Sequence, residues 1–444
     1  MDSKVAALRG TALRPVPVAV IGGAGYVGTI TAAGLAHLGH LVRAFDVNEE
    51  RIEMLRGGFC PFLEPDLPEL LHEQQRSGRL VFTPSLPEAL AEAAIVFVAV
   101  NTPRRSNGEA DLSHVIEVAL RLARQMNRHF VVAVKSTVPV GSHAAIRRVF
   151  ERSGLREGSD YDLVATPEFL REGHAVSDFF FPDRVVVGAD SADARAMVRE
   201  LFEPLQAPIL ETTIENAQMI KYAANAFLAM RISFINEVAN ICERVGADVE
   251  VVAQGIGYDR RIGHDYLRPG VGFGGPCLPK DLEGLIRLSE DAGYEPYFLK
   301  AVLEKNQHQR REILAKVHAL LGPSLYDRRI AVLGLTFKPN TSDVRNSTAS
   351  VLVDRLVRRG AEVTSYDPGL EAADVEGRVV RNPYEAAADA DLLLLATAWP
   401  QFRELDYGRI RTTMRSPNIV DAVNLLDPAS MRRLGFTYLS VGRP

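Results

Sequence analysis

The segment VAVIGGAGYVG, residues 18–28, constrains the fold of this chain more than any other feature. A short apolar run, typical of a buried strand, is followed at once by Gly23, Gly25 and Gly28 in the spacing GxGxxG, and then by a helical pattern. Glycines at these positions allow a tight turn, close approach of a pyrophosphate to a helix N-terminus, and close packing of the helix on the strand. The segment therefore predicts the first βα unit of a dinucleotide-binding sheet.

The same alternation of apolar runs and amphipathic stretches continues through LVRAFD, AIVFVAV, FVVAVKS and DLVAT, which favours a parallel sheet with right-handed crossovers. An apolar-periodic segment over 215–246 predicts one long connecting helix. After Gly322-Pro323 the α/β pattern restarts with RRIAVLGLTF, AEVTSYD and DLLLLATAW. We therefore expect an α/β fold with two Rossmann-like doubly wound domains, joined by a central helical domain with a long connecting helix.

Composition excludes several classes of function. The net charge of −5 gives no bulk attraction to nucleic acid or to an anionic membrane. Cys60, Cys242 and Cys277 are odd in number and far apart, which argues for a reducing compartment and against a disulfide framework or a zinc site. The first ten residues lack the apolar core of a signal peptide, and no run is long enough to span a membrane. We expect a cytoplasmic protein whose residues 1–14 form a flexible tail.

The second predicted strand ends in Phe45-Asp46, about twenty residues beyond the first glycine of the loop. A carboxylate at this place accepts hydrogen bonds from ribose hydroxyls and repels a 2′-phosphate, so Asp46 favours NAD over NADP. The alternative interpretation is a glycine-rich turn with an N-capping aspartate.

The segment GVGFGGPCLPKD, residues 270–281, places Cys277 just before a predicted helix N-terminus, with Lys280 close by. Both features favour a thiolate, although a tight turn beside a structural cysteine is the alternative. Lys221 and Asn225 are spaced i,i+4 on the long predicted helix; as an isolated pair they would more often be structural. Glu168 and Glu172, in TPEFLREG, follow a strand at the ligand-binding edge, where carboxylates can cap helices or hold a proton or a water.

Taken together, these motifs resemble the UDP-glucose 6-dehydrogenases, within the nucleotide-sugar dehydrogenases. The resemblance covers residues 17–425 in order: GAGYVG, FDVN with Arg51, VNTP, VKSTVPVG, TPEFLREG, IKYAANAF, YDRRIG, GFGGPCLPKD and LTFKPNTSDVR. It implies an NAD-binding Rossmann domain over 15–212, a central helical dimerisation domain with the cysteine loop over 213–312, and a UDP-sugar-binding Rossmann-like domain over 325–444. It also implies UDP-glucose as substrate and a homo-oligomer that is at least a dimer.

The resemblance also assigns roles to residues. It implies that Cys277 is a nucleophile in two successive oxidations, from alcohol through aldehyde to carboxylate. Lys221 and Asn225 would stabilise an oxyanion, and Asp281, Glu168 and Thr137 would position or deprotonate water. The remaining cofactor contacts implied are Tyr26, Val27, Arg51, Thr102, Thr137, Glu172, Lys280 and Arg345. The remaining substrate contacts implied are Phe169, Leu170, Glu172, Arg268, Gly272, Phe273, Gly274 and Lys338, with Arg261 reaching the substrate of a neighbouring subunit. No metal is implied.

Some residues depart from the family pattern: Pro276 replaces a small polar residue, Arg104 and Arg105 follow VNTP, and Asn346 replaces a common glutamate. They leave open a dehydrogenase for another nucleotide sugar, such as GDP-mannose or UDP-N-acetylmannosamine. Two further alternatives are a single-oxidation hydroxyacid dehydrogenase, which would not need Cys277, and a non-catalytic sensor of NAD or a nucleotide sugar.

Overall fold

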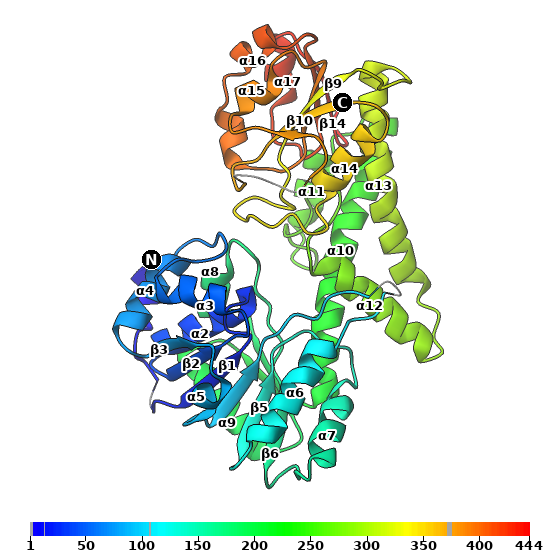
Figure 1. Cartoon of the computed structure of the whole chain (residues 1–444). Helices are drawn as coiled ribbons and strands as arrows, with labels where there is room; N and C mark the ends of the chain where they lie inside the picture. The colour runs from blue at the N-terminus through cyan, green and yellow to red at the C-terminus, as the bar shows by residue number, and fades with distance from the viewer. Residues whose placement is uncertain (1–2, 13, 106–107, 371–374) are drawn as a thin grey trace. The chain divides into compact units, whose positions relative to one another are not determined.

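The structure, a computed structural model of the chain, describes residues 3–12, 14–105, 108–370 and 375–444. It divides into two compact units, Met1–Ala223 and Ala224–Pro444 (Figure 1). Each unit contains one sheet with helices on both faces, as expected from the repeated alternation of apolar runs and helical stretches.

In the first unit, eight of the described strands form one sheet in the order β3-β2-β1-β4-β5-β6-β7-β8. Neighbouring strands are parallel except for β6 and β7, which are antiparallel. The strands are β1 (Pro17–Ile21), β2 (Leu41–Phe45), β3 (Leu80–Thr83), β4 (Ile95–Val98), β5 (Phe130–Val134), β6 (Tyr161–Ala165), β7 (Val185–Ala189) and β8 (Ile209–Thr212). The expected parallel sheet is confirmed, and the carboxyl ends of β1, β2, β4, β5 and β6 lie at one edge.

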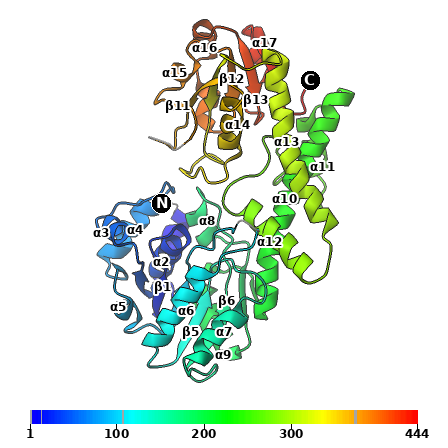
Figure 2. The same ribbon diagram turned by 45° about the vertical axis from the view of Figure 1, so that its right-hand side comes forward.

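Alternate residues of β1 enter opposite cores of this unit. Val18 and Val20 pack with one set of helices, whereas Ala19 and Ile21 pack with the other. The first core contains residues of α2 (Tyr26–Leu38), α3 (Glu49–Arg56), α4 (Leu67–Arg76), α8 (Ala175–Phe180) and α9 (Ala192–Phe202). The second contains residues of α5 (Leu86–Leu90), α6 (Ser113–Gln125) and α7 (His143–Arg152), and Figure 2 shows these layers. Burial on both faces explains why the strands are continuous apolar runs.

Some described residues of the N-terminal segment, 1–14, contact the first unit. Residues Ser3–Ala7 form a short helix, α1, and Val5 is buried in the core of the first unit. The buried His37 ring lies 2.8 Å from the Val5 carbonyl oxygen, and Arg9 pairs with Glu73. A polar ring inside an apolar core needs a hydrogen-bond partner, and this segment supplies one. The sequence did not indicate these contacts, because a single valine gives no periodic signal.

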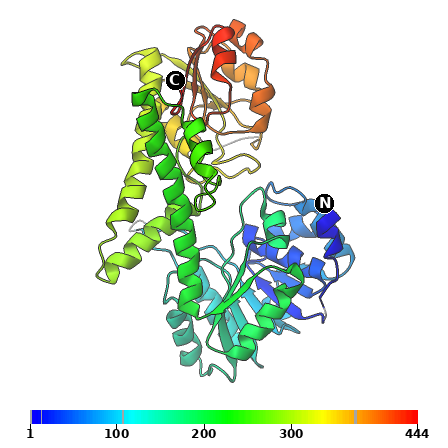
Figure 3. The ribbon, with the colours of Figure 1, turned by 180° about the vertical axis from the view of Figure 1, so that it is seen from behind.

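A long helix, α10 (Ile214–Val245), extends over 32 residues and matches the predicted connecting helix almost residue for residue (Figure 3). In the second unit it is accompanied by α11 (Val249–Gly257), α12 (Leu278–Asp291) and α13 (Tyr297–Leu321). Among the helices of the described residues, none is both long and apolar enough to cross a membrane.

The second sheet has the order β11-β10-β9-β12-β13-β14, and its strands are all parallel. One face packs on α10, α11, α13 and α14 (Thr348–Val357), and the other on α15 (Pro383–Ala387), α16 (Tyr407–Thr413) and α17 (Pro428–Arg433). The strands are β9 (Arg329–Leu333), β10 (Glu362–Tyr366), β11 (Arg378–Val379), β12 (Leu392–Leu395), β13 (Asn418–Asp421) and β14 (Thr437–Ser440). The expectation of two Rossmann-like domains and a helical region is thus confirmed.

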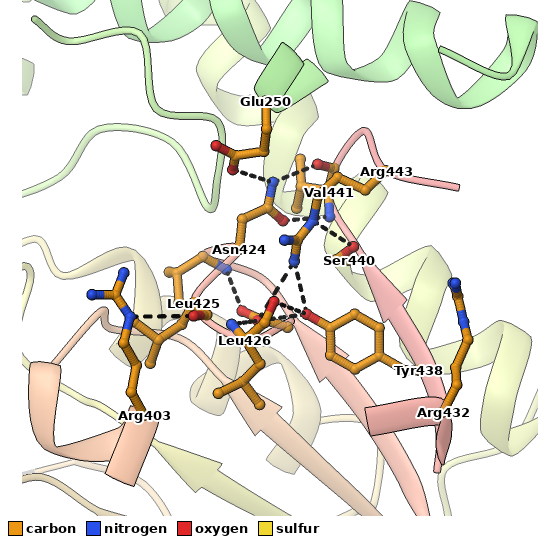
Figure 4. Close-up of polar contacts among 12 residues, drawn as sticks. Glu250, Arg403, Asn424, Leu425, Leu426, Arg432, Tyr438, Ser440, Val441 and Arg443 are labelled. Atoms are coloured by element: carbon orange, nitrogen blue, oxygen red, sulfur yellow. Dashed lines mark hydrogen bonds and ion pairs between the residues drawn. The ribbon is translucent and has the colours of Figure 1, made fainter. Parts of the chain in front are cut away.

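A buried polar cluster anchors the C-terminal residues to this sheet (Figure 4). Asp421, at the end of β13, accepts a hydrogen bond from the Tyr438 hydroxyl and lies 3.9 Å from the Arg443 guanidinium. Asn424 bonds to both Glu250 of α11 and the backbone of Val441. Tyr438 and Arg443 thus satisfy the carboxylate of Asp421, which is fully buried. Asn424 separately connects α11 to the backbone that follows β14.

We predict that Gly28→Ala strongly destabilises the protein, because a Cβ at this position would lie 2.0 Å from the Gly22 carbonyl oxygen. Gly255→Ala is the matched control: a Cβ added to this helical glycine would have nothing within 4 Å, and the backbone there is not left-handed. It should be neutral or stabilising by up to about 1 kcal/mol. Thermal unfolding of both variants checks this, and equal melting temperatures would contradict it.

Candidate active site

The glycine loop between β1 and α2 is shaped by contacts that exclude side chains. A Cβ on Gly23 would lie 2.7 Å from the Ala44 Cβ, and one on Gly28 would overlap the loop carbonyl. Asp46, directly after β2, accepts a hydrogen bond from the Ala24 N–H at 3.1 Å, so its carboxylate lies beside the loop. A side-chain-free loop at a helix N-terminus, with an adjacent carboxylate, fits the pyrophosphate and ribose of a dinucleotide.

Other predicted cofactor residues lie at the same sheet edge. The Thr102 hydroxyl, beyond β4, donates to the Thr137 carbonyl, beyond β5, at 2.8 Å. Tyr26 and Val27 begin α2, and Arg51 lies on the exposed side of α3. Lys280 and Arg345 belong to the second unit, so their proposed cofactor contacts stay predictions.

Glu168 and Lys221 form a buried ion pair in the first unit. The Lys221 Nζ lies 3.0 Å from Glu168 Oε1, and both side chains are almost wholly buried. The same ammonium lies 5.4 Å from the ring centre of Phe169, and the Leu170 N–H donates to Glu168. Burial pushes the pKa of Glu168 upward, but the charge of Lys221 and the Leu170 hydrogen bond outweigh it, and the net shift is downward. Glu168 is therefore held as a carboxylate.

A second buried lysine near this pair was not singled out from the sequence. Lys135, which follows β5, is 6% exposed and lies over the ring of Phe202. Burial lowers the pKa of Lys135 to about 8; Glu168 opposes the shift and the charge of Lys221 adds to it. Its position within VKST could have identified it as a candidate, because a lysine that directly follows an apolar strand lies at the ligand-binding edge of the sheet.

In the second unit, two of the predicted site residues, Asn225 and Asp281, are hydrogen-bonded to each other. Asn225 Nδ2 donates to Asp281 Oδ2 at 2.6 Å, and Lys280 Nζ lies 2.7 Å from Asp281 Oδ1. Asp281 is in the first turn of α12, and Cys277 is the N-cap residue of that helix, with an exposed side chain. A thiol at a helix N-terminus is placed where the helix dipole favours the thiolate.

The glycines before Cys277 lie against the chain itself. A Cβ on Gly272, which has a φ of +94°, would lie 2.3 Å from Asn306 Oδ1, and one on Gly275, with a φ of +80°, would lie 2.6 Å from the Phe337 ring. Phe273 is 3% exposed, and its N–H and C=O both bond to Asn306. The glycines thus let the loop pack tightly inside its own unit.

Three buried amides of the long helices hold this loop, and sequence reasoning missed all of them. Asn236 of α10 accepts from the Gly270 N–H at 2.8 Å, and Gln309 of α13 donates to the Gly270 carbonyl at 2.9 Å. With Asn306 they are at most 2% exposed. The sequence did contain one indication: Asn306 and Gln309 are spaced i,i+3 on an apolar helix face. Two buried amides so placed predict that a neighbouring segment supplies polar partners to both.

The predicted basic residues lie on loops of the second unit. Arg261 is paired with Asp259 and is 89% exposed, and Arg345 is paired with Asp343. Lys338 lies 5.5 Å from the ring centre of Phe337, and Arg268 is exposed. Arg261 and Arg345 each pair with an aspartate of their own loop. Their predicted contacts to substrate and cofactor therefore stay predictions.

The first unit has a dinucleotide site at the edge of its Rossmann sheet. The second unit, built on another Rossmann-like sheet, carries a thiol one helical turn before a buried carboxylate. Together these features define an NAD-dependent dehydrogenase with two α/β domains. Family models for the NAD-binding, central and UDP-binding domains of the UDP-glucose/GDP-mannose dehydrogenases match residues 16–206, 215–308 and 331–428. The chain belongs to this family and is an NAD-dependent oxidoreductase.

Several relatives are similar over almost their whole length. UDP-glucose 6-dehydrogenase TuaD of Bacillus subtilis is 42% identical, covering 96% of this chain and 93% of its own. UDP-glucose 6-dehydrogenase of Rhizobium meliloti is 44% identical, covering 95% and 98%. The solved UDP-glucose dehydrogenase of Pyrobaculum islandicum matches with a TM-score of 0.89 and 37% identity, covering 98% of this chain and 99% of its own.

We predict that the burial of Lys135 makes stability depend on pH. Its pKa is lowered to about 8 from an ordinary 10.5, so between these pH values the unfolded chain binds more protons than the folded one. The destabilising effect is fully present below pH 8 and is relieved as the pH rises toward 10.5. Wild type should therefore gain up to about 3 kcal/mol relative to Lys135→Met across this window, measured by denaturant unfolding.

Lys300→Met is a control of opposite sign, because hydrogen bonds to Glu290 and Glu295 raise the pKa of exposed Lys300. The advantage of wild type over that variant is present below pH 10.5 and is lost above it. Parallel pH profiles for wild type and Lys135→Met would show that Lys135 does not titrate in this window.

Proposed function

We propose that this enzyme oxidises UDP-glucose to UDP-glucuronate through a covalent intermediate on Cys277, with two NADH formed per turnover. The observation that carries the proposal is the exposed thiol at the N-terminus of α12, one turn before a buried Asp281 that is held by Asn225 and Lys280. A dehydrogenase that performs a single oxidation has no need for a nucleophile beside a carboxylate.

The thiol serves the second oxidation. An aldehyde has no readily transferable hydride until a nucleophile adds to it, and the Cys277 thiolate adds to give a thiohemiacetal. Loss of hydride from that carbon leaves a thioester, which water hydrolyses to the carboxylate and the free thiol. NAD, when bound, accepts the hydride of each oxidation, and the glycine loop with Asp46 would hold it.

The buried pairs suit the other steps. Lys221 and Asn225 lie one turn apart on α10, so an ammonium and an amide are available to stabilise an oxyanion on the substrate. Asp281 and Glu168 are held by fixed donors and would orient or deprotonate the hydrolytic water, with Thr137 as a further hydrogen-bonding group. Their partners fix the geometry before substrate binds.

We favour UDP-glucose as the substrate because relatives named UDP-glucose 6-dehydrogenase are 36–44% identical to this chain. A structure of UDP-D-ManNAc dehydrogenase from Pyrococcus horikoshii is 27% identical, with a TM-score of 0.87, and supports the second candidate, another UDP-sugar. A screen of UDP-glucose, UDP-N-acetylmannosamine and GDP-mannose with NAD, followed by NADH absorbance, separates them. The enzyme is expected to act in the cytoplasm, where the thiol of Cys277 stays reduced.

We predict that wild type forms two NADH per UDP-glucose and that Cys277→Ser does not complete the reaction. A serine hydroxyl is scarcely ionised near pH 7, and its ester hydrolyses more slowly than a thioester, so turnover should fall by orders of magnitude. Intact-protein mass spectrometry should show covalently held sugar, or the reaction should stop at the aldehyde.

Cys60→Ser is the matched control, because burial raises the pKa of the Cys60 thiol to about 11. That variant should keep two NADH per substrate. Near wild-type formation of UDP-glucuronate by Cys277→Ser would refute the thiol mechanism, whereas turnover only with another nucleotide sugar would change the substrate and not the chemistry.

We further propose that the enzyme is a homodimer that pairs through α10. Phe227, Phe234, Ile241 and Val245 are each more than half exposed, and they repeat at intervals of seven and four residues. Such spacing places apolar side chains on one face of a helix, which a second copy of the same helix can cover. Arg261, predicted to serve a neighbouring subunit, is largely uncovered within its own chain.

Phe234→Glu should therefore shift the protein toward the monomer in sedimentation analysis, since a carboxylate would be buried without a partner. Tyr326→Glu, at another exposed aromatic of the second unit, should leave the mass unchanged. A wild-type protein that sediments as a monomer at micromolar concentration would rule out the dimer.

A further inference from the structure

Glu64 is a buried carboxylate outside the pairs described above. It lies between α3 and α4 and is 3% exposed. Its Oε2 accepts a hydrogen bond from the Tyr26 hydroxyl and one from the Gly173 N–H at 2.6 Å. Its Oε1 accepts from the N–H groups of Ala175 and Val176, at 2.7 and 3.4 Å. Four donors thus converge on the roughly four lone-pair sites of one carboxylate.

Two of these donors, Tyr26 and Gly173, belong to predicted site segments that are far apart in the sequence. Tyr26 is the first residue of α2 and directly follows Gly25 of the dinucleotide loop. Gly173 closes the TPEFLREG segment, which carries Glu168 and Glu172. The Gly173 N–H also lies 3.2 Å from the Tyr26 hydroxyl oxygen, so the two segments meet at the carboxylate of Glu64.

The electrostatics show how tightly Tyr26 is held. Burial raises the pKa of Tyr26, and the hydrogen bond to Glu64 and the charges of Glu64 and Glu172 raise it further. The phenol therefore remains a donor, and it has a carboxylate acceptor in a buried environment. A charge-assisted hydrogen bond of this kind is about twice as strong as a neutral one.

We propose that Glu64 is a positioning residue that couples the dinucleotide loop to the segment carrying Glu168. When NAD binds, it orders the loop beside Tyr26. Because Glu64 is hydrogen-bonded to both Tyr26 and Gly173, the position of the Glu168 segment becomes fixed as well. A glutamine cannot replace it, because its amide nitrogen would face backbone N–H groups that are themselves donors.

The test is a double-mutant cycle of Glu64→Gln and Tyr26→Phe. Each single variant should weaken NAD binding by about fivefold or more in calorimetry without substrate, and each should lower kcat by about tenfold or more. The double variant should bind NAD no more weakly than Glu64→Gln alone, because both changes break the same connection. The binding measurement needs no turnover, so it stands even if the proposed substrate or thiol chemistry is wrong.

The matched control is Asp162→Asn, which alters another buried carboxylate of the first unit, one that pairs with His129. It should lower the melting temperature while leaving NAD affinity and kcat within about twofold of wild type. If Glu64→Gln behaves like this control, Glu64 is only structural. If the effects of Glu64→Gln and Tyr26→Phe on NAD affinity are additive, the two segments are not coupled through this carboxylate.

Discussion

The candidate site residues depend on two contacts, in each of which a side chain of α10 holds a buried carboxylate. Glu168 binds Lys221, and Asp281 binds Asn225, one helical turn further along. Burying a carboxylate without a partner costs several kcal/mol, so each pair constrains both its helix and its loop. Both donors belong to α10, a cationic one in the first unit and a neutral one in the second.

The cysteine loop combines a rigid approach with an exposed thiol. The backbone polar groups of Gly270 and Phe273 are hydrogen-bonded to three side chains, Asn236, Asn306 and Gln309. A side chain at the neighbouring glycines Gly272 and Gly275 would overlap other residues. Cys277 itself remains accessible at the N-terminus of α12. A nucleophile that is held by packing on one side and accessible on the other is suited to attack on a bound aldehyde, because little conformational entropy is lost when it is positioned for reaction.

Buried carboxylates also organise the first unit. Glu64, which lies between α3 and α4, accepts from the N–H groups of Gly173 and Ala175. Glu168 belongs to the TPEFLREG segment itself and accepts from the Leu170 N–H. The segment has no regular hydrogen-bond ladder of its own between β6 and α8, so side chains supply its acceptors. This gives the cofactor loop, through Tyr26, a physical connection to the residues assigned to chemistry.

The sequence by itself determined the two largely parallel sheets, the length of α10, and the glycine loop with Asp46. These features depend on local periodicity and on steric rules that act over a few residues. The roles proposed for Cys277, Lys221, Asn225, Asp281 and Glu168 come from the family resemblance and remain predictions. Only the tertiary structure decided which groups satisfy the buried polar atoms: Glu64 with Tyr26, Asn306 with Phe273, and the N-terminal Val5 with His37. Such partners are 32 to 38 residues apart in sequence. No local pattern specifies them, because a hydrogen bond across a fold depends on where the packed elements bring the backbone.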